Sequence, residues 1–372
     1  MRLLVLAVLS VFSLQCTKKN TNEILIGQFG SLTGSEATFG TSTDRGVRLA
    51  FEDINAKGGI HGKQIKLITL DDQGKAEEAA QAVTRLITQD RVVAVLGEVA
   101  STRTLAAAPI AQQYKVPLIT PSSTNPKVTD VGDQIFRVCF IDPFQGTVMA
   151  KFAVEHLKVK KVAILRDVKS DYSMGLADFF AAKTKELGGE IISDVSYSSG
   201  DTNFKAQLTK IKGTNPEAIF IPGYYTEVGL IAKQAKELGL NVPLMGGDGW
   251  DSSKLSEIGG AAINGHYFSN HYTTESKEPQ VVDFVTRYRS KYNESPDGLA
   301  ALGYDAALIL AEALKSNPEV TSANVREALT KIKDFNGVTG KITIDSNRNA
   351  IKSAVVVKVD GKDNRYVTTI TP

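Results

Sequence analysis

The chain has 372 residues, of which 42% are hydrophobic and 23% are charged. Those fractions are typical of a folded soluble protein, and the length suggests two domains. Lys and Arg number 43 against 41 Asp and Glu, which leaves a net charge of +2. This balance argues against a nucleic-acid-binding protein, which needs a basic face for phosphates. With only two cysteines, Cys16 and Cys139, a Cys₄ zinc site and a disulfide-stapled fold are excluded.

The N-terminus has the pattern of an export signal. Arg2 precedes an apolar run over residues 3–12 that is too short to span a bilayer. Cys16 follows, and the pattern resembles a bacterial lipoprotein signal, with residues 1–15 as signal peptide, Cys16 as the lipidated residue and residues 16–22 as tether. Leu14 and Gln15 depart from the usual signal, so an ordinary cleaved signal is the alternative. Both interpretations predict export to the periplasm or cell envelope, and the lipoprotein interpretation adds a membrane anchor.

The rest of the chain alternates strands and helices. Apolar stretches predict strands at Glu23–Gly30, Gln64–Asp71, Val92–Gly97, Val116–Thr120, Lys161–Arg166, Glu190–Ser196, Glu217–Pro222 and Val242–Gly247. Apolar residues at helical spacing lie between them, and residues 41–44 are expected to cap the first helix. Such alternation predicts an α/β protein with parallel sheets covered by helices on both faces. The strands are too many for one sheet, so we expect two lobes, with a first crossing at Phe136–Pro143.

Two hydroxyl-rich loops follow predicted strands in the first half. Glu98–Thr102 follows the strand at 92–97, and Pro121–Pro126 follows the strand at 116–120. Ligands of open α/β sheets bind at the carboxyl ends of strands, beside helix N-termini. Free backbone N–H groups and hydroxyls there suit a carboxylate, and apart from Arg103 neither loop has an Arg or Lys that its pattern directs inward. The alternative is that these Ser and Thr residues only cap helices.

The second half offers the opposite chemistry. Gly223–Tyr225 follows one predicted strand, and Asp248–Asp251 follows the next. An acidic residue at a strand end can accept a cation, and a tyrosine pair can supply an aromatic face. Together the two halves predict a receptor for a zwitterion, that is, a free α-amino acid. The alternative is that Asp248 caps a helix and Tyr224 packs between the lobes.

Longer stretches resemble the type I periplasmic solute-binding proteins of the leucine/isoleucine/valine-binding family. They are Asp53–Ile60 (DINAKGGI), Gly97–Ser101 (GEVAS), Thr120–Pro126 (TPSSTNP), Gly223–Tyr225 (GYY) and Gly303–Ala306 (GYDA). The resemblance covers nearly the whole chain after residue 23. It implies two Rossmann-like lobes joined by three crossovers, which close on a ligand like a hinged clamp. The lobes would comprise residues 23–142 with 273–345, and residues 143–272 with 346–372.

The resemblance also implies ligand-binding residues, position by position. Ser101 and Thr124 match the residues that hold the ligand carboxylate, and Ser122 matches one that gives a backbone contact. Asp248 matches the acidic residue on the α-ammonium. The remaining matches line the cleft, and they are Tyr172, Tyr224 and Phe39.

The sequence departs from the family at one of these positions and at one neighbouring position. Asp248 replaces a glutamate and is one methylene shorter, and Ala100 replaces a cysteine of a small disulfide. Trp250 and Asp251 follow Asp248, so Asp251 is a second candidate for the ammonium and Trp250 is expected to change the pocket volume. The amino acid that binds therefore stays open.

No pattern for catalysis, a cofactor or a metal is recognisable. The four histidines lie outside any H-E-x-x-H motif, and neither a G-x-S-x-G nor a dinucleotide-binding glycine pattern occurs. We therefore expect a monomeric, non-enzymatic amino-acid receptor without cofactor, which passes its ligand to an ABC transporter permease. The alternative function is a sensory ligand-binding module for amino acids or amides.

Overall fold

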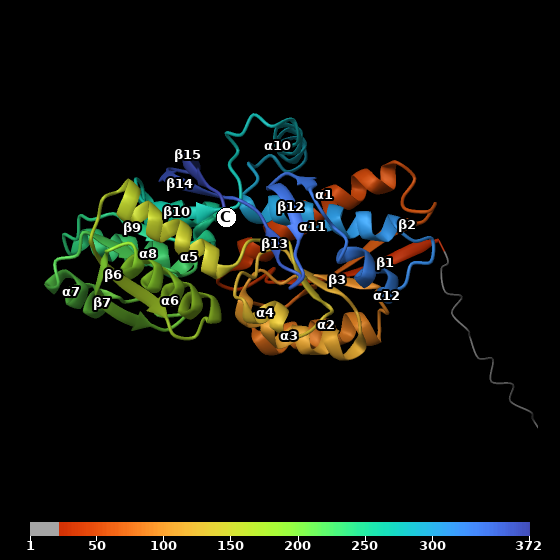
Figure 1. Cartoon of the computed structure of the whole chain (residues 1–372), viewed down its shortest axis with the longest axis horizontal. Helices are drawn as coiled ribbons and strands as arrows, with labels where there is room; N and C mark the ends of the chain where they lie inside the picture. Colours follow the sequence, from red (N-terminus) through yellow and green to blue (C-terminus); the bar gives the residue numbers. More distant parts are fainter. Residues whose placement is uncertain (1–21) are drawn as a thin grey trace, which may run out of the picture.

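The computed structural model describes residues 22–372, which form two α/β lobes (Figure 1). The predicted signal peptide of residues 1–15, the lipidation site Cys16 and all but the last residue of the predicted tether lie outside this range. Among the residues described, no helix is long and apolar enough to cross a membrane.

The first lobe is built on a five-stranded parallel sheet in the order β2-β1-β3-β4-β5. Its strands are β1 (Glu23–Gly30), β2 (Gln64–Asp71), β3 (Ala94–Leu96), β4 (Leu118–Thr120) and β5 (Ile135–Arg137). The helices of this half are α1 (Ala37–Ala56), α2 (Ala76–Thr88), α3 (Ser101–Tyr114), α4 (Lys127–Asp130), α10 (Pro279–Tyr292), α11 (Gly298–Lys315) and α12 (Ser322–Leu329).

Helices cover both faces of the first sheet, which explains its apolar strands. Val95 and Leu118 pack in one core cluster with α2 and α3. Their neighbours Leu96 and Ile119 point to the other face and pack with α1 and α11. Successive strand residues face opposite sides, so a strand buried on both faces must be continuously apolar.

The second lobe is built on a seven-stranded sheet in the order β15-β14-β10-β9-β8-β6-β7. Its strands are β6 (Lys161–Asp167), β7 (Glu190–Tyr197), β8 (Ala218–Phe220), β9 (Leu244–Gly246), β10 (Tyr267–Asn270), β14 (Ala354–Asp360) and β15 (Asp363–Ile370). The helices are α5 (Asp142–Lys151), which continues as a π-helical turn (Phe152–His156), α6 (Asp171–Glu186), α7 (Lys205–Gly213), α8 (Tyr225–Glu237) and α9 (Ser253–Gly259). Five strands are parallel, whereas β14 and β15 are antiparallel and form the C-terminal edge.

The chain passes between the lobes three times. It crosses between β5 and α5, between β10 and α10, and between the small strand β13 (Ala350–Ile351) and β14. β13 belongs to a three-stranded antiparallel sheet with β11 (Phe335–Gly337) and β12 (Gly340–Ile344). The predicted α/β fold with two lobes and three crossovers is confirmed, and the exact limits of the lobes stay a prediction.

The first helix begins earlier than the sequence predicts. Residues 41–44 were expected to cap it, but they lie inside α1, which starts at Ala37. The hydroxyl of Thr41 donates to the Ala37 carbonyl at 2.6 Å, and Ser42 donates to Asp297 at 2.6 Å. Because their hydroxyls find partners within the helix and on a neighbouring element, these residues are accommodated in its interior.

Gly46 sets how closely α1 approaches α11. A Cβ atom at this position would lie 2.0 Å from the Ala300 carbonyl oxygen, which is backbone and cannot rotate away. The two helices therefore pack at a distance that only glycine permits, and this contact attaches α11 to the first lobe.

We predict that Gly46→Ala destabilises the protein by about 1–3 kcal/mol, because overpacking forces the two helices apart. Urea unfolding at neutral pH measures the change. Gly213→Ala is the matched control, because a Cβ there meets nothing within 4 Å. A Gly46→Ala protein as stable as the control would contradict this account of the helix contact.

Candidate functional site

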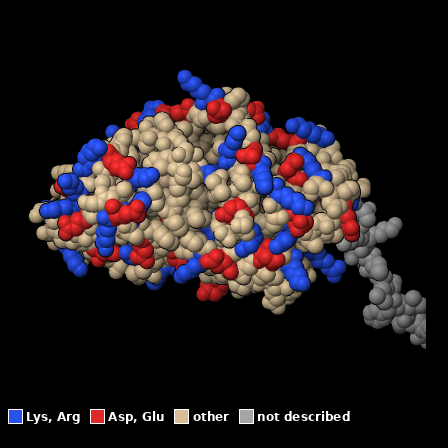
Figure 2. Space-filling model, in the orientation of Figure 1, with Lys and Arg blue, Asp and Glu red and all other residues tan. Residues whose placement is uncertain are grey.

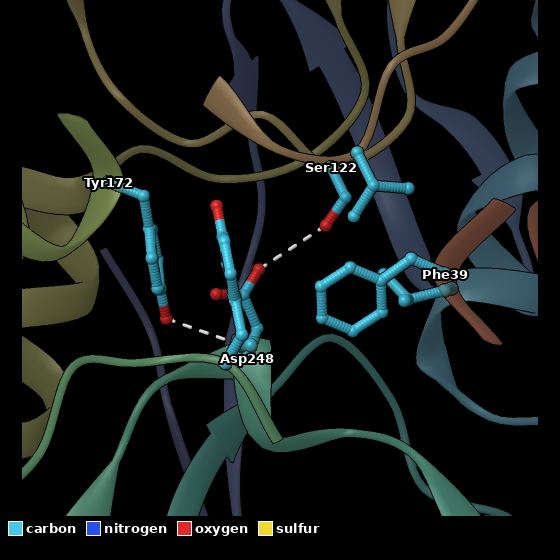
Figure 3. Close-up of a pocket in the computed structure, with 8 residues that line it drawn as sticks. Phe39, Ser122, Tyr172 and Asp248 are labelled. Atoms are coloured by element: carbon cyan, nitrogen blue, oxygen red, sulfur yellow. Dashed lines mark hydrogen bonds between the residues drawn. The ribbon is translucent and has the colours of Figure 1, made fainter. Parts of the chain in front are cut away.

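A small cavity of about 10 Å³ lies between the lobes, at the carboxyl ends of both sheets. Residues from the first lobe and the second lobe face each other across it (Figure 3). The first lobe contributes Phe39, Val99, Ser122 and Leu299, and the second contributes Tyr172, Tyr224, Asp248 and Gly249.

Hydroxyl groups gather on the first-lobe side, where Ser122 lines the cavity and Ser101 and Thr124, the other two predicted residues, do not. Ser101 is the first residue of α3, and its Oγ accepts a hydrogen bond from the Asn125 backbone N–H at 3.2 Å. Ser122 and Thr124 lie just after β4, and all three residues are buried. The two predicted loops are thus held together beside the N-terminus of α3, where backbone N–H groups and the helix dipole favour an anion.

The Asp248 carboxylate projects from the second lobe after β9. Its Oδ1 accepts from Gln145 Nε2 at 2.8 Å, and its Oδ2 lies 2.9 Å from His271 Nε2. Ser122 of the first lobe donates to the same Oδ2 at 3.3 Å, so this hydrogen bond spans the two lobes (Figure 3).

The donors around Asp248 are neutral. Burial lowers the pKa of His271 to about 4, against a smaller opposing effect of its hydrogen bond with Asp248. A neutral ring that donates from Nε2 carries no proton on Nδ1, and Nδ1 has no hydrogen-bond partner among residues 22–372. Within the same range no Lys or Arg forms an ion pair with Asp248. The site therefore fixes this carboxylate without cancelling its charge.

Aromatic rings form the rest of the wall. Tyr172 and Tyr224 stack with ring centroids 5.4 Å apart, and Phe39 meets Tyr224 edge-on at 5.3 Å. The Tyr172 hydroxyl accepts a hydrogen bond from the Gly249 N–H at 3.2 Å, which fixes the ring. With Val99 and Leu299, this wall gives the cavity an apolar side next to its two polar ends.

Trp250 and Asp251 do not line the cavity. The Trp250 indole is buried in the second lobe, where Nε1 donates to the Ile221 carbonyl at 2.9 Å. The Asp251 carboxylate accepts from Asn270 Nδ2 at 2.8 Å and from the Gly298 N–H at 2.6 Å. The expected effect of Trp250 on pocket volume is therefore wrong, and of the two acidic residues only Asp248 faces the cavity.

Gln145 and His271 hold Asp248 in the site, and no sequence pattern indicated either of them. Gln145 lies one turn into α5, directly after the first crossing, and His271 directly follows β10. Their positions directly after a crossing and a strand were the only available signal. Glutamine and histidine are common at such positions, so this signal does not point to a binding site. Among the described residues, no group of three or more His, Cys, Asp or Glu is placed to hold a metal ion.

A family model described as periplasmic binding protein matches residues 23–364. This chain belongs to the periplasmic binding protein family. An amino acid binding protein of Pseudomonas aeruginosa is 34% identical over 316 residues, which cover 84% of this chain and 83% of the relative. A leucine-, isoleucine-, valine-, threonine- and alanine-binding protein of the same organism is 32% identical over 87% of this chain and 86% of its own length.

Solved structures agree with the family. The leucine binding protein LivK of Thermotoga maritima is 42% identical with a TM-score of 0.90, over 94% of this chain and 99% of its own. The branched-chain amino acid transporter substrate binding protein LivJ of Streptococcus pneumoniae, in complex with isoleucine, is 38% identical with a TM-score of 0.90 over 94% and 100%. The predicted family is thereby confirmed.

Because His271 is neutral in the folded protein, we predict that the free energy of unfolding of this periplasmic binding protein falls in acid. Its folded pKa of about 4 lies below the ordinary value of 6.5, so the unfolded chain binds the proton first as pH falls. The stabilisation is present above pH 6.5 and is lost between pH 6.5 and 4. From pH 7 to pH 5 the loss is roughly 2 kcal/mol, since one pKa unit corresponds to about 1.4 kcal/mol.

His271→Gln, which cannot titrate, is expected to lose about 2 kcal/mol less than the native chain over this interval. Urea unfolding at pH 7 and pH 5 measures the difference. His156→Gln serves as control, since that ring is exposed. Equal acid sensitivity of native and His271→Gln proteins would contradict the role given to this ring.

Proposed function

We propose that this protein binds a free α-amino acid with an aliphatic side chain between its lobes and delivers it to an ABC transporter permease. The observation that carries the proposal is the cavity, where the Asp248 carboxylate of the second lobe, which has no Lys or Arg partner among the described residues, faces Ser122 of the first lobe. Ser101, at the N-terminus of α3, and Thr124, in the same loop as Ser122, lie outside the lining of the cavity and complete the proposed carboxylate end. Those two ends match an ammonium and a carboxylate. The apolar wall between them matches a branched aliphatic side chain.

Each site residue has a role in this proposal. Ser101 and Thr124 bind the ligand carboxylate, with the backbone at Ser122 as a further contact. Asp248 binds the α-ammonium, while Phe39, Tyr172 and Tyr224 enclose the ligand. The names of relatives that bind leucine, isoleucine or valine support this ligand class.

The physical basis is the closure of two half-sites. The ligand carboxylate binds first to the hydroxyl loops, and closure brings Asp248 to the ammonium. Both ligand charges are then desolvated but paired, which avoids the cost of an unpaired buried charge. Hydrogen bonds to charged groups contribute about 1.5–3 kcal/mol each, and at the two charged ends they would supply most of the specificity for the orientation of the ligand.

The proposal extends to the cellular location and oligomeric state of the protein. Members of this family are solute-binding proteins, and we infer export to the periplasm or cell envelope, no catalytic activity and a monomeric state. Cys16 would carry a lipid anchor that holds the protein at the membrane beside its permease. Lys, Arg, Asp and Glu are interspersed over both lobes on the face in Figure 2, in keeping with a small-molecule ligand and no nucleic-acid partner.

Asp248→Ala is expected to weaken binding of leucine or isoleucine at least tenfold, about 1.4 kcal/mol, because the ammonium loses its charged partner. Ser101→Ala is expected to weaken it through the carboxylate. Isothermal titration calorimetry measures both effects. Asp178→Asn is the matched control, since that second-lobe aspartate is 68% exposed. Unchanged affinity in a folded Asp248→Ala protein would refute the assignment.

The anchor has a separate test. In a bacterial host that processes lipoproteins, the native chain should appear in the membrane fraction and the Cys16→Ser chain in the soluble extracytoplasmic fraction. Mass spectrometry of the mature N-terminus should show acyl groups on Cys16. A soluble native protein without acyl groups would support the ordinary cleaved signal instead.

A further inference from the structure

Three residues connect the lobes at a point away from the cavity lining. Thr102 of α3 and Asn125, which follows the β4 loop, both contact Asp171, the first residue of α6. The Thr102 hydroxyl donates to Asp171 Oδ2 at 2.9 Å and accepts from the Asp171 backbone N–H at 3.0 Å. Asn125 Nδ2 donates to the Asp171 carbonyl at 2.7 Å. One residue of the second lobe is thus held by two loops of the first.

Each of these three residues is the direct sequence neighbour of a proposed ligand-binding residue. Thr102 follows Ser101, Asn125 follows Thr124, and Asp171 precedes Tyr172. None of Thr102, Asn125 and Asp171 lines the cavity. Asn125 also donates its backbone N–H to Ser101 Oγ at 3.2 Å, which ties the contact to the hydroxyl loops. Movement of either lobe breaks these hydrogen bonds without any direct effect on a ligand.

We propose that Thr102, Asn125 and Asp171 form a latch between the lobes that sets how tightly the site holds every ligand without choosing among ligands. The latch rests on the proposed function, since it acts on amino-acid affinity. The apparent Kd equals the intrinsic Kd divided by the fraction of protein in the binding-competent state. A contact made only between closed lobes raises that fraction by the same factor for all ligands.

Thr102→Val is the cleanest variant. It is close in shape to threonine, and the hydroxyl it removes has hydrogen bonds only to Asp171 among the described residues. We expect an equal loss of affinity, about fivefold, for leucine, isoleucine and valine, given the usual strength of a lost hydrogen bond. The loss should lie in the dissociation rate, because the open protein still presents the same half-sites.

Gly175 provides a variant that separates stability from binding. A Cβ atom at this helical position would lie 3.0 Å from Asn125 Nδ2, which is tighter than most packing contacts and requires the Asn125 side chain to shift. Alanine favours a helix interior over glycine. Gly175→Ala should therefore keep or raise the melting temperature while it crowds Asn125 and weakens binding. A purely structural role of this region would not separate the two measurements in this way.

Calorimetry and stopped-flow dissociation with leucine, isoleucine and valine test the latch on the full chain. Thr84→Val is the matched control, because its exposed hydroxyl donates only within α2, to the Ala80 carbonyl. The expected result is a uniform loss for Thr102→Val and native affinity for Thr84→Val. Unchanged affinity for Thr102→Val, or a changed ranking of the three amino acids, would overturn the latch.

If the proposed function is wrong, the experiment gives a result that differs from failure of the latch. The native protein would then bind none of the three amino acids, which leaves the latch to be tested without ligand. Small-angle scattering should in that case give a larger radius of gyration for Thr102→Val than for the native chain. Equal radii would overturn the latch.

Discussion

The Asp248 carboxylate is the constraint on which the site depends. It is buried between the lobes, where a charge is costly unless it is hydrogen-bonded and paired. Its donors are Gln145, His271 and Ser122, which come from α5, from the second crossing and from the first lobe. None of them cancels the charge when His271 is neutral. The fold thus prepares a negative group for a cation and makes its full set of partners depend on both lobes.

The first lobe keeps its own charges away from this carboxylate. Arg103 lies near the hydroxyl loops, yet its guanidinium is 3.1 Å from both Glu98 and Glu36. Its charge is therefore matched within the lobe, and the proposed carboxylate end of the site is left to hydroxyls and backbone N–H groups. Under the proposed function, neutral donors would hold the ligand carboxylate and Asp248 would hold the ligand ammonium, with the aromatic wall between them. Selection for a zwitterion would follow from this separation.

Much of the fold follows from local sequence. Strands of the first sheet read as continuous apolar runs because helices bury both of their faces, as at Val95 and Leu96. The bounds of the elements were less predictable, as for the strand expected at 92–97, which is Ala94–Leu96. Hydrogen bonds to neighbouring strands continue on either side of it, at the N–H groups of Val93 and Gly97, so the hydrogen-bonded run is longer than the strand itself. The antiparallel pair β14 and β15 has a local hairpin signal in Asp360-Gly361, but its place at the sheet edge depends on β10, more than 80 residues earlier in the chain.

By itself the sequence determined the α/β class, the two lobes and the hydroxyl and acidic loops at strand ends, because periodicity and strand-end position are local properties. Only the tertiary structure decided which of Asp248 and Asp251 faces the cavity, where Trp250 lies, and that Gln145 and His271 hold Asp248. These outcomes depend on side-chain direction after a turn and on three chain crossings that bring distant segments together. The spacing of residues along one segment determines neither the direction of a side chain after a turn nor which distant segments the crossings bring together.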